Sequence, residues 1–181
     1  GLNEFFEGDL NELGIVMLGG MYNNVMRALM AFDMADIFGK SRLPLYVMNV
    51  AYPVVDEEIE RFCQGKKAVL VIEEGQPEYH EQAIHTVLGR AQIRIKVHGK
   101  DMLPQAGEYT VQTLKRGLQS FLAQYHPAAL AKPVSWQALQ VASYIALPSG
   151  PAAAAFPSEG AVAAVTGAGT SGEGSLLQLP F

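Results

Sequence analysis

The feature that most constrains this chain is an alternation of short apolar runs with stretches whose apolar residues recur at helical spacing. Three of the runs, 13–18, 45–50 and 68–72, are almost entirely apolar, as strands buried on both faces of a sheet must be. Each run leads into a Gly- or Pro-bearing turn and then into a helical period. This order predicts an α/β fold of three layers, α/β/α, with a mostly parallel, doubly wound sheet in the middle.

The turn residues and charges predict where the helices begin and end. The first helix is expected from about Met21 to Gly39, which would supply a left-handed cap. The second is expected between the acids at 56–58, which suit a first helical turn, and Gly65. Pro77 suits the first position of the third helix. The apolar residues of the last helix are Val111, Leu114, Leu118, Phe121 and Leu122.

The fourth run differs from the others. Ile93, Ile95 and Val97 alternate with Arg94 and Lys96. Alternation of this kind places the basic side chains on a solvent-exposed face, which is typical of a strand at the edge of a sheet.

The composition changes near Pro127. Residues 1–127 carry nearly all the charge, whereas 31 of the 54 residues in 128–181 are Ala, Gly, Ser or Pro. A segment with so few large side chains predicts a linker or tail. Only the stretch from Trp136 to Leu147 has apolar residues that could dock on the preceding domain. We therefore expect an α/β domain at 1–127 and a linker or tail at 128–181.

Charge and cysteine content exclude several classes of function. The 13 Lys and Arg against 18 Asp and Glu leave a net charge of −5, so no basic excess is available to bind nucleic acid or an anionic membrane. No run of roughly 18 apolar residues is present to span a bilayer. Cys63 is the single cysteine, which is too few for a disulfide or a cluster-binding set. A reduced, cytoplasmic setting fits best.

The candidate functional residues follow the predicted strands. Ligands and partners of open parallel sheets usually meet the loops at the carboxyl ends of the strands. The residues in those loops that we assign as candidates for a domain interface are Gly19, Gly20, Tyr22, Asn23, Tyr52, Glu73, Glu74, Gln76, His98 and Lys100.

Single motifs leave alternatives open. Gly19-Gly20 could cradle a phosphate or could form a tight strand-to-helix turn, which we favour. Glu73 and Glu74 could act as a base or bind a cation. Adjacent strand residues point to opposite faces, so we favour one of them capping the next helix and the other meeting a partner. His80 and His85 are five residues apart, whereas the zinc-helix motif needs four.

Taken together, several ordered segments resemble a known family. They are Leu13–Val16, Gly19–Asn23, Arg27–Leu29, Pro44–Pro53, Phe62–Lys66, Val69–Glu78 and His98–Thr110. In this order they resemble the middle domain of the thiamine-diphosphate-dependent indolepyruvate ferredoxin oxidoreductases. That domain is similar to the transketolase C-terminal domain. The resemblance covers about residues 10–125.

The resemblance implies a parent enzyme and a particular sheet. The enzyme would oxidatively decarboxylate arylpyruvates, pass electrons through iron–sulfur clusters to ferredoxin and form a coenzyme A thioester. Thiamine diphosphate and magnesium would be its further cofactors, and its other domains and subunits would be partners, with a homo-oligomer expected. The sheet would be mixed, of about five strands, with an antiparallel strand supplied by Leu2–Phe6.

Two departures from the family limit what this chain can do. The Gly-Asp-Gly signature with its downstream Asn pair is missing, and only Gly8-Asp9-Leu10 comes near it. There is also no cysteine cluster. We therefore assign no catalytic, cofactor-binding or metal residue and expect a noncatalytic structural domain that supports cofactor-domain packing and subunit assembly, inactive when isolated. The alternatives are a stand-alone small-molecule or nucleotide-binding module and a dimerisation module.

Overall fold

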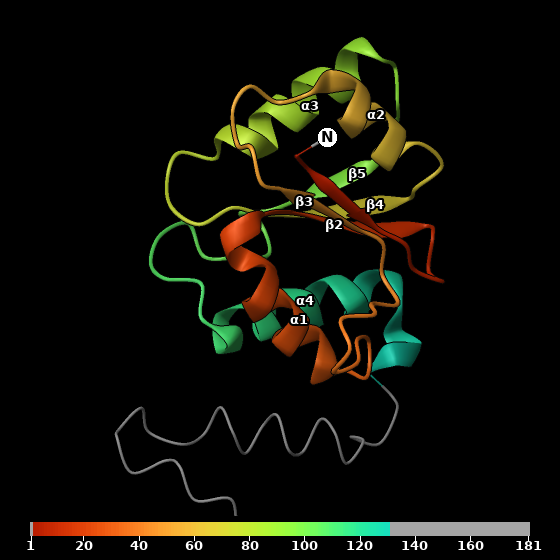
Figure 1. The fold of residues 1–181 in the computed structure, drawn as a ribbon, viewed down its shortest axis with the longest axis vertical. Coiled ribbons are helices and arrows are strands. Elements are labelled where there is room, and N and C mark those ends of the chain that lie inside the picture. The colour runs from red at the N-terminus through yellow and green to blue at the C-terminus, as the bar shows by residue number, and fades with distance from the viewer. Residues whose placement is uncertain (1, 131–181) are drawn as a thin grey trace, which may run out of the picture. The chain divides into compact units, whose positions relative to one another are not determined.

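The fold is known from a computed structural model that describes residues 2–130 (Figure 1). Its sheet has five strands in the order β1-β3-β2-β4-β5. The strands are β1 (Glu4–Phe6), β2 (Leu13–Leu18), β3 (Leu45–Met48), β4 (Ala68–Ile72) and β5 (Lys96–His98). Strands β2 to β5 are parallel, and β1 is antiparallel to β3. The predicted mixed sheet with an antiparallel N-terminal strand is therefore confirmed.

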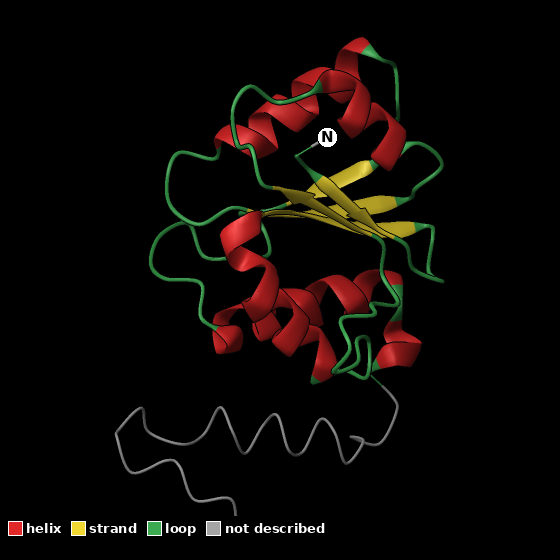
Figure 2. Ribbon diagram, viewed as in Figure 1, coloured by secondary structure: helices red, strands yellow, loops and turns green. Residues whose placement is uncertain are grey.

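Helices cover both faces of the sheet (Figure 2). They are α1 (Tyr22–Met30), α2 (Asp56–Cys63), α3 (Tyr79–Arg90) and α4 (Val111–Tyr125), with short 3₁₀ turns η1 (Gly19–Met21) and η2 (Pro127–Ala129). Helices α1 and α4 lie on one face, and α2 and α3 lie on the other. This arrangement confirms the predicted three-layer α/β/α class.

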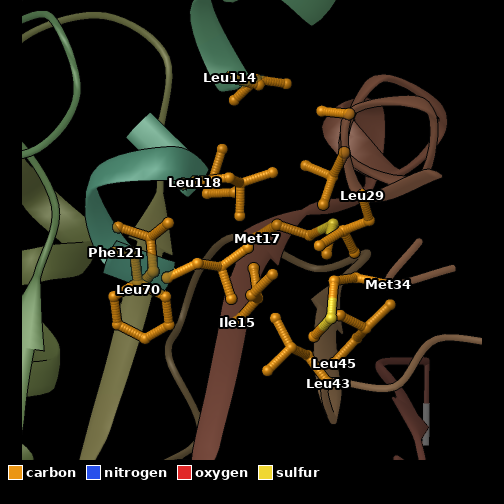
Figure 3. Close-up of a cluster of buried hydrophobic side chains, with 14 of the residues drawn as sticks. Ile15, Met17, Leu29, Met34, Leu43, Leu45, Leu70, Leu114, Leu118 and Phe121 are labelled. Carbon is orange, nitrogen blue, oxygen red and sulfur yellow. The ribbon is translucent and has the colours of Figure 1, made fainter. Parts of the chain in front are cut away.

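The core on the α1 and α4 side is the larger of the two. Ile15, Met17 and Leu70 of the sheet meet Leu29 of α1 and Phe121 of α4 (Figure 3). All five side chains are at most 1% exposed. Burial of this kind is worth about 1.5–3 kcal/mol for each large apolar side chain, so it is the main term that holds these layers together.

The second core lies between the sheet and α2 and α3. It takes the alternate residues of the same strands, such as Val16 and Val71, together with Ile59 and Ile84. Neighbouring residues of a strand point to opposite faces, so each solid apolar run serves both cores. Cys63 is buried here, and burial raises the pKa of its thiol to about 12. The thiol is therefore protonated at neutral pH and packs as a small apolar group.

Helix α1 ends nine residues before the predicted cap at Gly39, so that prediction was wrong. Asp33, not Gly39, takes the left-handed conformation that closes the helix, with φ of 58°. The amides of Met34 and Asp33 donate to the carbonyls of Leu29 and Met30, at 3.0 and 3.1 Å, which is the Schellman pattern. Gly39, with φ of 85°, lies further on in the loop that returns to β3.

Other boundaries differ less from the prediction. The edge strand is confirmed at β5 but includes only Lys96–His98, although Ile93 and Ile95 still pack on the second core. Helix α3 begins at Tyr79, two residues after Pro77. Gly65 follows α2 with φ of 77°, as its predicted position requires.

The predicted linker or tail at 128–181 lies, from residue 131 onward, outside the described residues. The predicted docking of Trp136 to Leu147 lies outside them as well. The division into 1–127 and 128–181 therefore stays a prediction. Among residues 2–130, no helix has both the length and the apolar character to cross a membrane.

Gly8 has a packing requirement that can be tested. A Cβ atom on Gly8 would lie 2.5–2.6 Å from backbone atoms of Arg42, Leu43 and Pro44. Backbone cannot move aside as a flexible side chain can, so Gly8→Ala should lower the free energy of unfolding by about 2 kcal/mol. Gly20→Ala is the matched control, because a Cβ there would have no atom within 4 Å. Urea unfolding should separate the two variants, and equal stability would contradict the packing at Gly8.

Candidate functional site

The predicted candidate residues do meet at one edge of the sheet. Strands β2 to β5 are parallel, so their carboxyl ends, and the loops that follow them, lie on the same side (left in Figure 2). We call this side the carboxyl edge. Its loops are 19–21 after β2, 49–55 after β3, 73–78 after β4 and 99–110 after β5.

Glu73 at the end of β4 caps helix α3. Its carboxylate is buried, with the residue 6% exposed, and Oε2 accepts hydrogen bonds from the amides of His80 at 2.9 Å and Glu81 at 3.4 Å. Amides in the first turn of a helix have no partner within the helix, so a carboxylate there can accept their hydrogen bonds. Its negative charge also interacts favourably with the positive end of the helix dipole. The interpretation that one of the two glutamates caps the next helix is confirmed.

The ring of His80 joins two loops of the carboxyl edge. Its Nδ1 lies 2.7 Å from Glu73 Oε1, and its Nε2 lies 2.9 Å from the carbonyl oxygen of Ala51. A carbonyl oxygen only accepts, so Nε2 donates to Ala51, while Nδ1 forms the hydrogen bond with the Glu73 carboxyl group. The ring therefore ties the loop after β3 to the end of β4.

The role of His80 is one that sequence reasoning missed. The only signal in the sequence was a histidine near a helix start, a few residues after a buried strand that ends in an acid. His85 is exposed on α3, away from any shared ligand set, and residues 2–130 contain no group of three His, Cys, Asp or Glu side chains that could hold a metal ion.

Lys100 is hydrogen-bonded within the domain. Its Nζ donates to the carbonyl oxygen of Glu73 at 2.6 Å and to the hydroxyl of Tyr109 at 2.8 Å. Tyr109 is fully buried, and its hydroxyl donates to the carbonyl oxygen of Pro104. The backbone amide of Lys100 donates to Glu81 Oε2 at 3.0 Å. These bonds fix the loop after β5 against β4 and α3.

Glu74 binds a different segment from Glu73, in line with the prediction that the two would not act as one pair. It is exposed, and its Oε1 accepts from the backbone amide of Tyr109 at 2.5 Å. Asn24 of α1 donates to the carbonyl oxygen of the same Tyr109 at 3.4 Å. Gln76 lies near Gln105, with 3.5 Å between the two amide groups. Tyr109, which was not among the predicted residues, is thus the centre of this part of the edge.

His98 forms a second internal pair. Its Nδ1 lies 2.6 Å from Asp101 Oδ2, and its Nε2 lies 2.7 Å from the hydroxyl of Tyr125 on α4. Burial acts to raise the pKa of Asp101, but the hydrogen bonds from His98 and the Gly99 amide outweigh it and leave this pKa below its usual value. Burial, and then the charge of Asp101, raise the pKa of Tyr125.

The remaining candidates divide between packing and exposure. A Cβ on Gly19 would collide with the side chain of Asn49, so Gly19 permits close approach of the loops after β2 and β3. This supports the tight-turn interpretation of Gly19-Gly20. Tyr22 is half-buried and stacks on Phe6, with 5.3 Å between ring centroids. Asn23 is exposed, and Tyr52 is 88% exposed.

The described residues do not fit an iron–sulfur cluster or a magnesium ion, two of the cofactors that the family resemblance implies. Iron–sulfur clusters need several thiolates, whereas Cys63 is a single buried thiol. Magnesium prefers free carboxylate oxygens, whereas those of Glu73, Glu81 and Asp101 accept hydrogen bonds from the domain itself. The fold and this edge define an α/β/α domain whose polar strand-end groups bond mainly to one another.

Comparison with known proteins confirms the resemblance found in the sequence. The indolepyruvate oxidoreductase subunit IorA of Methanothermobacter thermautotrophicus is 34% identical over 120 residues, which are 65% of this chain and 18% of that protein. The IorA subunit of Pyrococcus abyssi is 28% identical over 116 residues, which are 64% and 17%. The IorA subunit of Thermococcus kodakarensis is 27% identical over 121 residues, which are 67% and 18%.

The chain is therefore homologous to one segment of indolepyruvate oxidoreductase subunits, and it spans less than a fifth of their length. No protein-family model matches it. A solved structure described as a split-gene transketolase, an inactive beta4 tetramer, aligns with a TM-score of 0.47 and 22% identity. That alignment covers 67% of this chain and 41% of the other.

Proposed function

We propose that this chain is a noncatalytic structural domain of an indolepyruvate-type 2-oxoacid ferredoxin oxidoreductase. In this proposal, its carboxyl edge packs against the cofactor-binding domains and supports subunit assembly. Thiamine diphosphate, magnesium and the iron–sulfur clusters are held by other parts of that enzyme, and ferredoxin is met there as well.

One observation carries the proposal. The ionisable side chains of the carboxyl edge, those of Glu73, Glu74, His98 and Lys100, each bond to a group of the same domain. Residues that act as a base or nucleophile need a free face toward the substrate. Here the hydrogen bonds of the same side chains hold the loops in place, as expected of a structural domain. The kind of enzyme in this proposal comes from the relatives, which are named as indolepyruvate oxidoreductase subunits.

The test is Glu74→Ala in the complete enzyme. This change removes the acceptor for the Tyr109 amide, a charge-assisted bond worth about 1.5–3 kcal/mol, and frees the 104–110 loop. We expect assembly, measured by sedimentation, to weaken about tenfold or more, while turnover per assembled active site changes less than about threefold.

His85→Ala is the matched control, because this exposed side chain lies on α3 away from the edge. It should change neither assembly nor turnover. If Glu74→Ala assembles normally but loses a hundredfold in turnover, about 2.7 kcal/mol of transition-state stabilisation, the edge belongs to an active site and the proposal is wrong.

A further inference from the structure

Two exposed tyrosines flank the hydrogen bond that joins the loops of the carboxyl edge. His80 donates to the carbonyl oxygen of Ala51 at 2.9 Å. Tyr52 follows Ala51 and is 88% exposed, and Tyr79 precedes His80 and is 67% exposed. Val55, 36% exposed, ends the same loop. We call Tyr52, Val55 and Tyr79 the tyrosine surface.

The backbone beneath the tyrosine surface is held in place. His80 is paired with the buried Glu73 at 2.7 Å, which fixes the start of α3. The amide of Val50 donates to the side chain of Asn3 at 3.0 Å, which fixes the loop after β3. Rings presented on fixed backbone lose little further entropy on binding, and tyrosine is enriched where protein surfaces meet.

The surroundings of the tyrosine surface are acidic. Segments 49–60 and 73–82 contain eight Asp and Glu residues and no Lys or Arg. Asp56 and Glu57, in the first turn of α2, are exposed among them. The two nearby bases are already in contact with this domain: Arg61 lies 4.3 Å from the centroid of the Phe5 ring, and Lys100 is bonded to Glu73.

This charge decides which partner fits. A second copy of the chain meeting the same surface would bring two acidic rims together, and like charges at an interface cost affinity. A partner with Lys and Arg around an apolar or hydrogen-bonding pocket is complementary. More than four fifths of each relative lies outside the matched segment, so other domains of the same polypeptide are available.

We infer that the tyrosine surface is the docking point for a basic face of another domain of the same oxidoreductase. This inference rests on the proposed function and names its contact. Tyr52 and Tyr79 enter the partner domain, and Asp56 and Glu57 pair with its Lys and Arg residues. His80 acts as a positioning residue that joins the two segments carrying these tyrosines.

The experiment places a photo-crosslinking phenylalanine analogue at position 52 or 79 of the assembled enzyme. Both substitutions keep an aromatic ring, so folding should be retained. We expect crosslinks from both positions to one peptide that carries Lys or Arg. Salt at 1 M, where the screening length falls to about 3 Å, should reduce their yield several-fold. The same analogue at position 38 is the control, because Phe38 is 89% exposed on the α1-to-β3 loop.

A second readout separates this inference from the proposed function. Hydrogen exchange of the edge loops is compared between the 181-residue chain and the assembled enzyme. Protection of 51–55 and 79–82 on assembly supports the inference. Protection of 19–23 and 99–110 alone, or crosslinks to a second copy or to an acidic peptide, overturns it and leaves the proposed function standing. An edge without any protection on assembly overturns both.

Discussion

Replacing Val71 with aspartate should abolish the cooperative fold of this domain. Val71 is 3% exposed in β4, pairs with Val16 of β2 and packs in the core beneath α2 and α3. A carboxylate there would have no partner, and burying an unpaired charge costs at least several kcal/mol. Domains have a total stability of about 5–15 kcal/mol, so we expect loss of the native melt or a fall of more than about 15 °C in melting temperature.

Val55→Asp is a matched control for this prediction. Val55 is the residue before the first turn of α2 and has extended backbone angles, with φ of −96° and ψ of 105°. Aspartate is a preferred residue at such an N-cap, so the same chemical change should leave stability within about 1 kcal/mol of the parent. A cooperative melt of the Val71→Asp chain near that of the parent would show that 68–72 is not a buried strand.

The sequence predicted the interior strands well because their signal is local. The runs at 13–18 and 68–72 became β2 and β4 with the same boundaries, since each is bounded by polar or turn residues. The end of α1 was missed for a tertiary reason. Phe32 continues the helical period, but Asp33 takes a left-handed conformation and a bridge between Ala35 and Ser41 turns the chain back.

The candidate site shows the same division. Because Glu73, Glu74 and Lys100 each follow a predicted parallel strand, the sequence was enough to predict that they lie at one edge of the sheet. Their partners could not be predicted, because His80 and Tyr109 reach them only through the fold. Alternation along a strand did predict that the two glutamates would bind different groups. The sequence thus located the edge, and packing decided how its groups pair.

Glu73→Ala is expected to have the second large effect, because Glu73 is the acceptor for both the backbone and the ring of His80. Removing the Glu73 carboxylate leaves three partly buried groups without their partner. They are the amides of His80 and Glu81 and the Nδ1 atom of the His80 ring. Each unsatisfied group of this kind costs about 1–3 kcal/mol, so the free energy of unfolding should fall by about 3 kcal/mol. Hydrogen exchange in the first turn of α3 should rise with it.

Glu73→Gln separates the loss of hydrogen bonds from the loss of charge. The glutamine oxygen can still accept from the His80 amide, and its NH₂ group can donate to Nδ1 of a neutral ring whose Nε2 still donates to Ala51. We therefore expect Glu73→Gln to cost about 1 kcal/mol or less in urea unfolding. If it costs as much as Glu73→Ala, a carboxylate at position 73, and not only a hydrogen-bonding group, is needed to hold the loops together. If both variants cost under about 1 kcal/mol, the cap contributes little, and the loop after β3 is held by Asn3 rather than by His80.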